Sequence, residues 1–397
     1  MHSSLLPDYQ HLHAHAKRLL LCADALSHSV SKVEDSYWEH LAEQCIETLL
    51  LSDESTIIEQ LFQYLNEHQL TEHLEIIASL LEGCSESITL EDASSGQRYE
   101  ALLISIPITT WTRYSLPEGP METELIHALE AQLHQDILAP NVKVVLHPEL
   151  LCFEDVPHNL HQARQLLESL AKQALGVHGK STTKLPPRSE HPTLLADARF
   201  VLAVILAPEH APLFAWQQNK EPAAALQERL LSTWQEHSQE LFAGVFTGCQ
   251  TEYWLPNAFH ANNRVAEQHL RPLNLKATVT WLQTVAQVPK GQLTAVIAAC
   301  GQEQIEEYRI GFCVADSDVV IHGCIWPLLD PDDQSDTLAQ ISALLKELES
   351  GDVLLLPGLY EPEFCDDCET PYFPNPDAQL VHPEFPEQID SEPPLLH

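Results

Sequence analysis

The sequence predicts an α/β (α+β) protein with a helical N-terminal module, a tandem-duplicated α/β layered body and an irregular, acidic, proline-rich tail. Three observations predict this order. Apolar residues first recur at helical spacing, strand-length apolar runs then alternate with amphipathic stretches, and prolines gather at the end. We place the boundaries at 1–92 for the helical module, 93–190 and 191–357 for the two α/β repeats, and 358–397 for the tail.

Composition supports a folded chain and excludes some functions. The 397 residues are 44% hydrophobic, enough for a packed core. With 58 acidic and 20 basic residues the net charge is −38, which argues against direct binding of nucleic acid. Mimicry of nucleic acid by an acidic face is a remote alternative. The longest uncharged apolar run, 101–112, is well short of the roughly 18–20 residues of a membrane span. We therefore expect a protein that is cytoplasmic and does not bind membranes, since 1–5 also lack the features of a secretory signal.

The helical module is predicted from residue 8 to about residue 84. Leu12, Leu19 and Leu20 begin a pattern of apolar residues at helical spacing, and the pattern continues into the following stretches. The polar break at 51–55 provides a cap before the third helix. No strand-like run interrupts this region.

The body is predicted from two similar halves about 100 residues apart. The first half is read as strand, helix, strand and helix at Tyr99–Pro107, Glu122–Ile137, Val142–His147 and His158–Leu175. The second half repeats this order at Phe200–Pro208, Ala223–Phe242, Gly244–Leu255 and Asn262–Val285, after a linker at 176–192. Pro272 is expected to interrupt or kink the last helix.

A third block, 292–357, is predicted to form three strands, a helix and a strand that extend the sheet of the second repeat. The last stretch, counted from Pro357, carries nine of the 27 prolines and no Lys or Arg. We therefore expect it to be extended and largely irregular.

Cys365 and Cys368 form the strongest local motif. Two thiolates at this spacing can hold one zinc ion from a tight turn, and His382 offers a third ligand. His322, Cys324 or an acidic side chain is expected to complete the set if the tail folds back. An inert reduced pair and a thiol–disulfide pair are the alternatives.

We assign no binding site to the remaining cysteines or to the histidine cluster near the N-terminus. The eight other cysteines are isolated among apolar residues, which predicts reduced, buried side chains. His11, His13 and His15 are interpreted as a solvated helix face.

Aromatic and basic side chains form three further clusters. Their residues are Trp111, Arg113, Tyr114, Trp216, Tyr308 and Arg309. Loops after strands often carry binding sites, so these residues are candidate ligand-binding residues. Packing between the two repeats is the alternative interpretation. No recognised catalytic constellation is present, so we assign no catalytic residue and leave open whether the protein is an enzyme.

Several segments together resemble an uncharacterised bacterial family of unknown function. The segments are 33–39, 111–114, 213–217, 307–312, 326–328, 361–368 and 381–384, spread over nearly the whole chain. The resemblance implies no mechanism. The family's tail typically reads Cys-x-x-Cys-Gly, whereas Glu369 stands at the glycine position here.

Two functional hypotheses follow. The first is a non-catalytic binding or scaffold protein with a structural zinc knuckle in the tail and an unknown protein or small-molecule partner. The second is an enzyme of unknown class in which Arg113, Tyr114, Tyr308 and Arg309 bind an anionic small molecule between the repeats.

Overall fold

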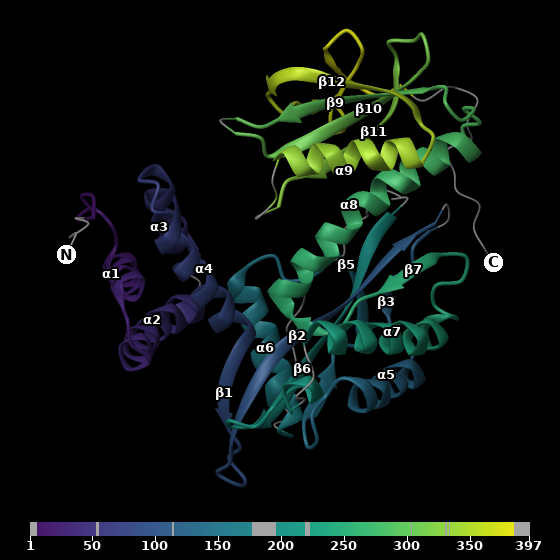
Figure 1. The fold of residues 1–397 in the computed structure, drawn as a ribbon. Helices are drawn as coiled ribbons and strands as arrows, with labels where there is room; N and C mark the ends of the chain where they lie inside the picture. Colours follow the sequence, from purple (N-terminus) through teal and green to yellow (C-terminus); the bar gives the residue numbers. More distant parts are fainter. Residues whose placement is uncertain are drawn as a thin grey trace.

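Four helices, a large sheet covered by helices on both faces, and a small sheet with the C-terminal segment follow one another along the chain (Figure 1). This computed structural model describes residues 6–52, 55–112, 115–176, 196–218, 223–302, 304–329, 332 and 334–384. Among the described helices, none is long and apolar enough to cross a membrane.

The predicted all-helical N-terminal module is confirmed. Its helices are α1 (Ala14–His28), α2 (Lys32–Ser52), α3 (Ser55–Glu67) and α4 (Thr71–Glu86). Apolar residues at helical spacing, such as Leu19, Ile46 and Leu61, are fully buried in its core. The predicted boundary at residue 92 is too late, because β1 (Ser87–Glu91) already pairs with the sheet of the body.

Two long antiparallel strands form the centre of the large sheet. β2 (Arg98–Trp111) pairs with β6 (Ala196–Pro208) from Tyr99 opposite Pro208 to Trp111 opposite Ala196. Along the outer edge of β2 lie β1, β8 (Asn257–Ala258) and β7 (Gln250–Tyr253). Along the outer edge of β6 lie β4 (Lys143–Leu146) and β5 (Glu149–Cys152), and β3 (Gly119–Pro120) pairs with β5.

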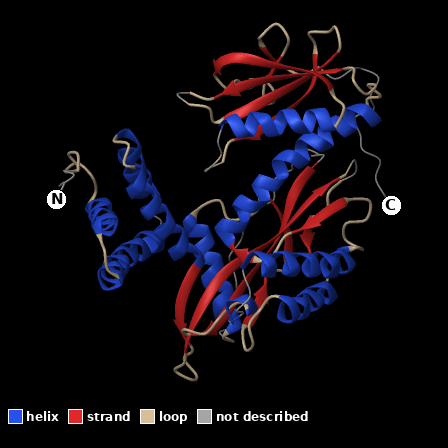
Figure 2. Cartoon of the chain, viewed as in Figure 1, coloured by secondary structure: helices blue, strands red, loops and turns tan. Residues whose placement is uncertain are grey.

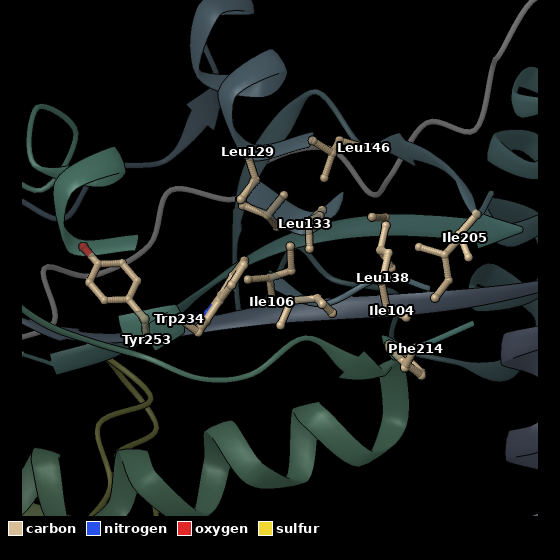
Figure 3. Close-up of a cluster of buried hydrophobic side chains, with 14 of the residues drawn as sticks. Ile104, Ile106, Leu129, Leu133, Leu138, Leu146, Ile205, Phe214, Trp234 and Tyr253 are labelled. Carbon is tan, nitrogen blue, oxygen red and sulfur yellow. The ribbon is translucent and has the colours of Figure 1, made fainter. Parts of the chain in front are cut away.

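Helices cover both faces of this sheet, which explains why its central strands are apolar at consecutive positions. On one face, α5 (Thr123–Asp136) and α7 (Ala223–Phe242) pack on alternate residues of β2, including Ile104 and Ile106 (Figure 3). On the other face, α6 (Leu160–Ala174) and α8 (Phe259–Thr284) pack on the intervening residues, such as Leu103.

The two halves have a similar order of strands and α-helices, except that β3 occurs in the first half alone among the described residues, and their tandem duplication stays a prediction. Each half contributes one central strand to the sheet. Each half also contributes one helix to each face of the sheet. The outer strands cross over, since β4 and β5 of the first half pair with β6, and β7 and β8 of the second half pair with β2. The predicted boundary at 190/191 therefore does not divide the sheet. Apart from Gly176, the predicted linker at 176–192 lies outside the described residues.

The third block has the predicted order of elements, but the prediction that it extends the large sheet is wrong. Its strands form a separate sheet (Figure 2). Their order in this sheet is β11-β10-β9-β12. The elements are β9 (Leu293–Cys300), β10 (Glu307–Val314), β11 (Val320–Pro327), α9 (Gln334–Glu347) and β12 (Gly351–Tyr360). Helix α8 is the reason for the separation, because its C-terminal half leaves the large sheet and packs on the small one through Leu275, Val279 and Leu282.

Pro272 does not interrupt α8, which runs continuously for 26 residues with the proline inside it. The preceding residue, Arg271, is buried and ties this part of the helix to the small sheet. Its Nη1 donates to the carbonyl oxygen of Pro327 at 2.9 Å and forms an ion pair with Asp332. These contacts hold the helix beside the sheet at the proline.

Candidate metal centre and neighbouring sites

The C-terminal segment folds back onto the face of the small sheet opposite α8 and α9. It is less irregular than predicted, since β13 (Phe373–Pro374) pairs with β14 (Leu380–Val381). Two glycines of the sheet make the close approach possible. A Cβ atom on Gly311 would lie 2.1 Å from the carbonyl oxygen of Pro374, and one on Gly323 would lie 2.2 Å from the ring of Phe373.

Arg309 fastens the same segment from within β10. The side chain is fully buried, and its Nε donates to Glu307 at 2.6 Å. Its Nη1 donates to the carbonyl oxygens of Glu363 at 2.6 Å and Tyr372 at 2.9 Å, on either side of the cysteine pair. The guanidinium also lies 4.8 Å from the ring centre of Phe364. Arg309 therefore positions the ends of the loop that carries Cys365 and Cys368.

The loop between these ends is a tight turn. The amide of Cys365 donates to the carbonyl of Thr370, and the amide of Glu369 donates to the carbonyl of Cys365, both at 2.9 Å. Glu369 has a φ of 58°, the left-handed conformation that glycine adopts most readily. The turn thus forms with glutamate at the position where the resembling family has glycine.

This turn and the β13–β14 hairpin bring the predicted metal ligands together. One ligand atom from each of Cys365, Cys368 and His382 lies within 4.8 Å of the others. Cys368 Sγ lies 3.2 Å from His382 Nε2, and Cys368 and His382 are both exposed. Hydrogen bonding with Thr370 lowers the pKa of Cys368, which favours the thiolate form that binds metal. Two sulfurs and one imidazole suit zinc by the chemistry of the donors.

The predicted completion of this set by His322 or Cys324 is wrong. Both residues belong to β11 and face the helices, away from the C-terminal segment. The ring of His322 lies 5.6 Å from that of Trp281 on α8, and Cys324 is buried in the core beneath α8 and α9. An acidic side chain, such as the neighbouring Asp366 or Asp367, remains as the predicted alternative for the fourth position.

The other cysteines are buried or half-buried in the structure. Burial raises the pKa of Cys45, Cys300 and Cys313 to about 11, so these side chains are thiols at neutral pH. This agrees with their interpretation as small apolar core residues.

A second group of candidate ligands lies at the end of the large sheet. Ligand atoms of Glu118, Cys152 and Asp155 lie within 4.8 Å of one another. Burial and the hydrogen bond to Asp155 raise the pKa of Cys152 to about 12, so its sulfur is protonated and donates to the carboxylate at 3.1 Å. Arg199 is already the cation of this region, forming an ion pair with Asp197 and lying 3.9 Å from Glu118. We interpret the group as a buried ionic network.

The four predicted ligand-binding residues that the structure describes do not come together in one site. Tyr308 and Arg309 are buried on opposite faces of the small sheet, outside the space between the repeats. Trp111 lies at the end of β2, where its Nε1 donates to Gln250 at 2.8 Å. Arg113 and Tyr114 lie outside the described residues. Of the four predicted residues that the structure describes, Trp216 alone lines the cavity between α7 and α8.

This cavity, of about 610 Å³, lies between α7, α8 and the 3-10 helix η1 (Ala215–Gln218). Besides Trp216, it is lined by Leu230, Trp254, Asn262, Val265 and His269, among others. Trp254, Asn262 and His269 were not predicted as site residues. The polar-aromatic stretch 253–262, which begins at the end of the predicted strand Gly244–Leu255, is the signal that could have marked two of them.

A sequence-family profile described as "Protein of unknown function (DUF2863)" matches residues 6–396. The chain belongs to this family. DUF2863 thus covers the helical module, both halves of the large sheet, the small sheet and the cysteine turn. No curated protein and no solved structure matches the chain.

Proposed function

We propose that this DUF2863 protein is a non-catalytic, zinc-containing binding protein of the cytoplasm. Cys365, Cys368 and His382 would hold a structural zinc ion, and a protein or small molecule would be its partner. The observation that carries the proposal is the convergence of two sulfurs and one imidazole nitrogen within 4.8 Å on a segment fastened to the sheet by Arg309. Tetrahedral zinc accepts such a donor set.

The zinc ion would act by joining parts of the C-terminal segment. Cys365 and Cys368 lie on the turn, whereas His382 follows β14, so one ion would close the loop between them. Apparent binding free energies of complete structural zinc sites reach roughly 10–16 kcal/mol, enough to stabilise a segment with little apolar core. Phe373 is the buried apolar anchor of this segment, packed against Cys313 and Val320.

Elemental analysis of untagged protein, purified without chelator, tests the proposal. We expect about one zinc per chain in the wild type, as for a single structural site, and none in a Cys365→Ser, Cys368→Ser double variant. A His11→Asn, His13→Asn, His15→Asn triple variant is the control, because closely spaced histidines near the N-terminus can also collect metal during purification. Zinc that disappears from the histidine variant and stays in the cysteine variant contradicts the proposal, as does metal-free wild-type protein.

A further inference from the structure

The cavity beside Trp216 has no charged side chain among the described residues that line it. This is unusual in a chain of which 20% of the residues are charged and whose net charge is −38. Among the described lining residues the single titratable one is His269, and burial lowers its pKa, so its ring is neutral at pH 7. A ligand with a formal charge would lose its hydration here without an opposite charge to compensate.

Two indole rings on the cavity are held in place. Trp216 stacks on Phe214 with ring centres 4.3 Å apart and an angle of 9°. Trp254 stacks on His269 at 3.5 Å and 14°, and its Nε1 donates to Thr109 at 3.1 Å. Fixed aromatic faces favour planar ligands, because little conformational entropy is lost on binding.

One buried polar side chain gives the cavity a hydrogen-bonding preference. Asn262 is 3% exposed, and its amide group donates to the carbonyl oxygens of Ser105 at 2.7 Å and Leu255 at 2.9 Å. These two bonds use both amide hydrogens and fix the orientation of the side chain. The group that Asn262 retains for a ligand is its acceptor, Oδ1.

We propose that this cavity is a binding site for a neutral, planar, aromatic small molecule that carries an N–H or O–H donor for Asn262. A volume of about 610 Å³ lies within the range of small-molecule sites. The proposal does not depend on zinc, since the cavity and the cysteine turn share no residue. It also differs from an anion site between the repeats, which would need a cation in the lining.

Equilibrium dialysis at about 0.15 M salt with four probes tests the proposal. Indole is neutral, planar and carries one N–H, and benzothiophene has nearly the same shape without the donor. Indole-3-carboxylate and tryptamine add a negative and a positive charge to the same ring. We expect saturable binding of indole, several-fold weaker binding of benzothiophene, and at least about tenfold weaker binding of both charged probes. The negative net charge of the protein would weaken the binding of indole-3-carboxylate and strengthen the binding of tryptamine. Weaker binding of both probes therefore identifies desolvation of the charged group as the cause.

Two variants locate the binding. Leu230→Trp and Val265→Phe fill the cavity from α7 and α8 and should each weaken indole binding at least about tenfold. Leu355→Trp introduces the same large side chain on β12, where Leu355 is 58% exposed, and should leave binding unchanged. Far-UV circular dichroism checks that each variant is folded. Any of three results would overturn the proposal. They are no saturable binding of indole, wild-type affinity for indole in both filled variants, or a charged probe that binds as tightly as indole. Equal binding of benzothiophene would overturn the role of Asn262.

Discussion

Arg309 donates a hydrogen bond of 2.9 Å from Nη1 to the carbonyl oxygen of Tyr372. The same nitrogen also holds the carbonyl of Glu363, so one buried cation of the small sheet closes both ends of the cysteine-bearing loop. The two backbone carbonyls accept from Nη1 alone, and Glu307 supplies the counter-charge to Nε at 2.6 Å. Zinc binding by the cysteine turn and attachment of the C-terminal segment therefore both depend on β10.

Replacing Arg309 by methionine should detach this loop. The variant leaves Glu307 without its partner and two carbonyls unpaired, at a cost of about 3 kcal/mol. If detachment precedes cleavage, chymotrypsin should cut after Tyr372 on the order of 100-fold faster than in the wild type, as identified by fragment mass. Arg98→Met is the control, because the Arg98–Glu209 pair is partly exposed and contributes less than about 1 kcal/mol. Equal cleavage of the two variants would show that Arg309 does not hold the loop.

The attachment of this segment could not be predicted from the sequence. The proline content predicted extended chain, and the cysteine spacing predicted three ligands, but neither indicated which face of a sheet would receive them. That information lies in the register of β10 and β11, which sets Gly311 opposite Gly323 and directs Arg309 toward the segment. Single glycines and a lone arginine within apolar runs carry no periodic signal, so only the tertiary structure reveals their role.

Local sequence patterns predicted the individual strands and helices better than they predicted how these elements assemble. The apolar runs at 99–107 and 200–208 predicted strands because both faces of β2 and β6 are buried. Cross-pairing of the outer strands was not predictable, since the sequence order of strands does not state which edge each one joins. The same limit applies to the cavity, because Trp216, Trp254 and His269 come from η1, the loop after β7 and α8.

Gly311→Ala should loosen the C-terminal segment through a steric clash. The added Cβ would lie 2.1 Å from the carbonyl oxygen of Pro374, and backbone on both sides must move, at a cost of about 1–3 kcal/mol. We expect faster chymotrypsin cleavage after Tyr372 and lower zinc content after dialysis. Gly83→Ala in α4 is the matched control, since no atom lies within 4 Å of the new Cβ, and should stabilise the protein by about 0.5–1 kcal/mol. Wild-type cleavage rates in Gly311→Ala would contradict the close packing.

Glu369→Gly should stabilise the cysteine turn. Glycine removes the penalty for the φ of 58° at this position, and the net gain after its larger unfolded-state entropy is about 0.5–1 kcal/mol. Cleavage of the segment should slow by roughly two- to fivefold, which is that free energy expressed as a rate ratio. Glu369→Gln removes the charge and keeps the backbone penalty, so it should cleave like the wild type. If the glutamine variant alone shows the slower cleavage, charge rather than backbone conformation limits the turn.

His237 should make the contact between α7 and α5 depend on pH. Its Nδ1 lies 2.7 Å from Oδ2 of Asp136, and the hydrogen bond with that carboxylate, assisted by its charge, raises the pKa of His237. A raised folded-state pKa means that the stabilisation is fully present below the unfolded value of about 6.5 and is lost as the pH rises through the folded value. The difference in thermal midpoint between wild type and His237→Gln should therefore be largest near pH 5.5–6 and shrink toward pH 9. His134→Gln is the control substitution, because it changes an exposed histidine of α5 and leaves the His237–Asp136 pair in place. A His237→Gln difference that grows with pH would mean that neutral histidine is the stabilising form, contrary to the ion pair with Asp136.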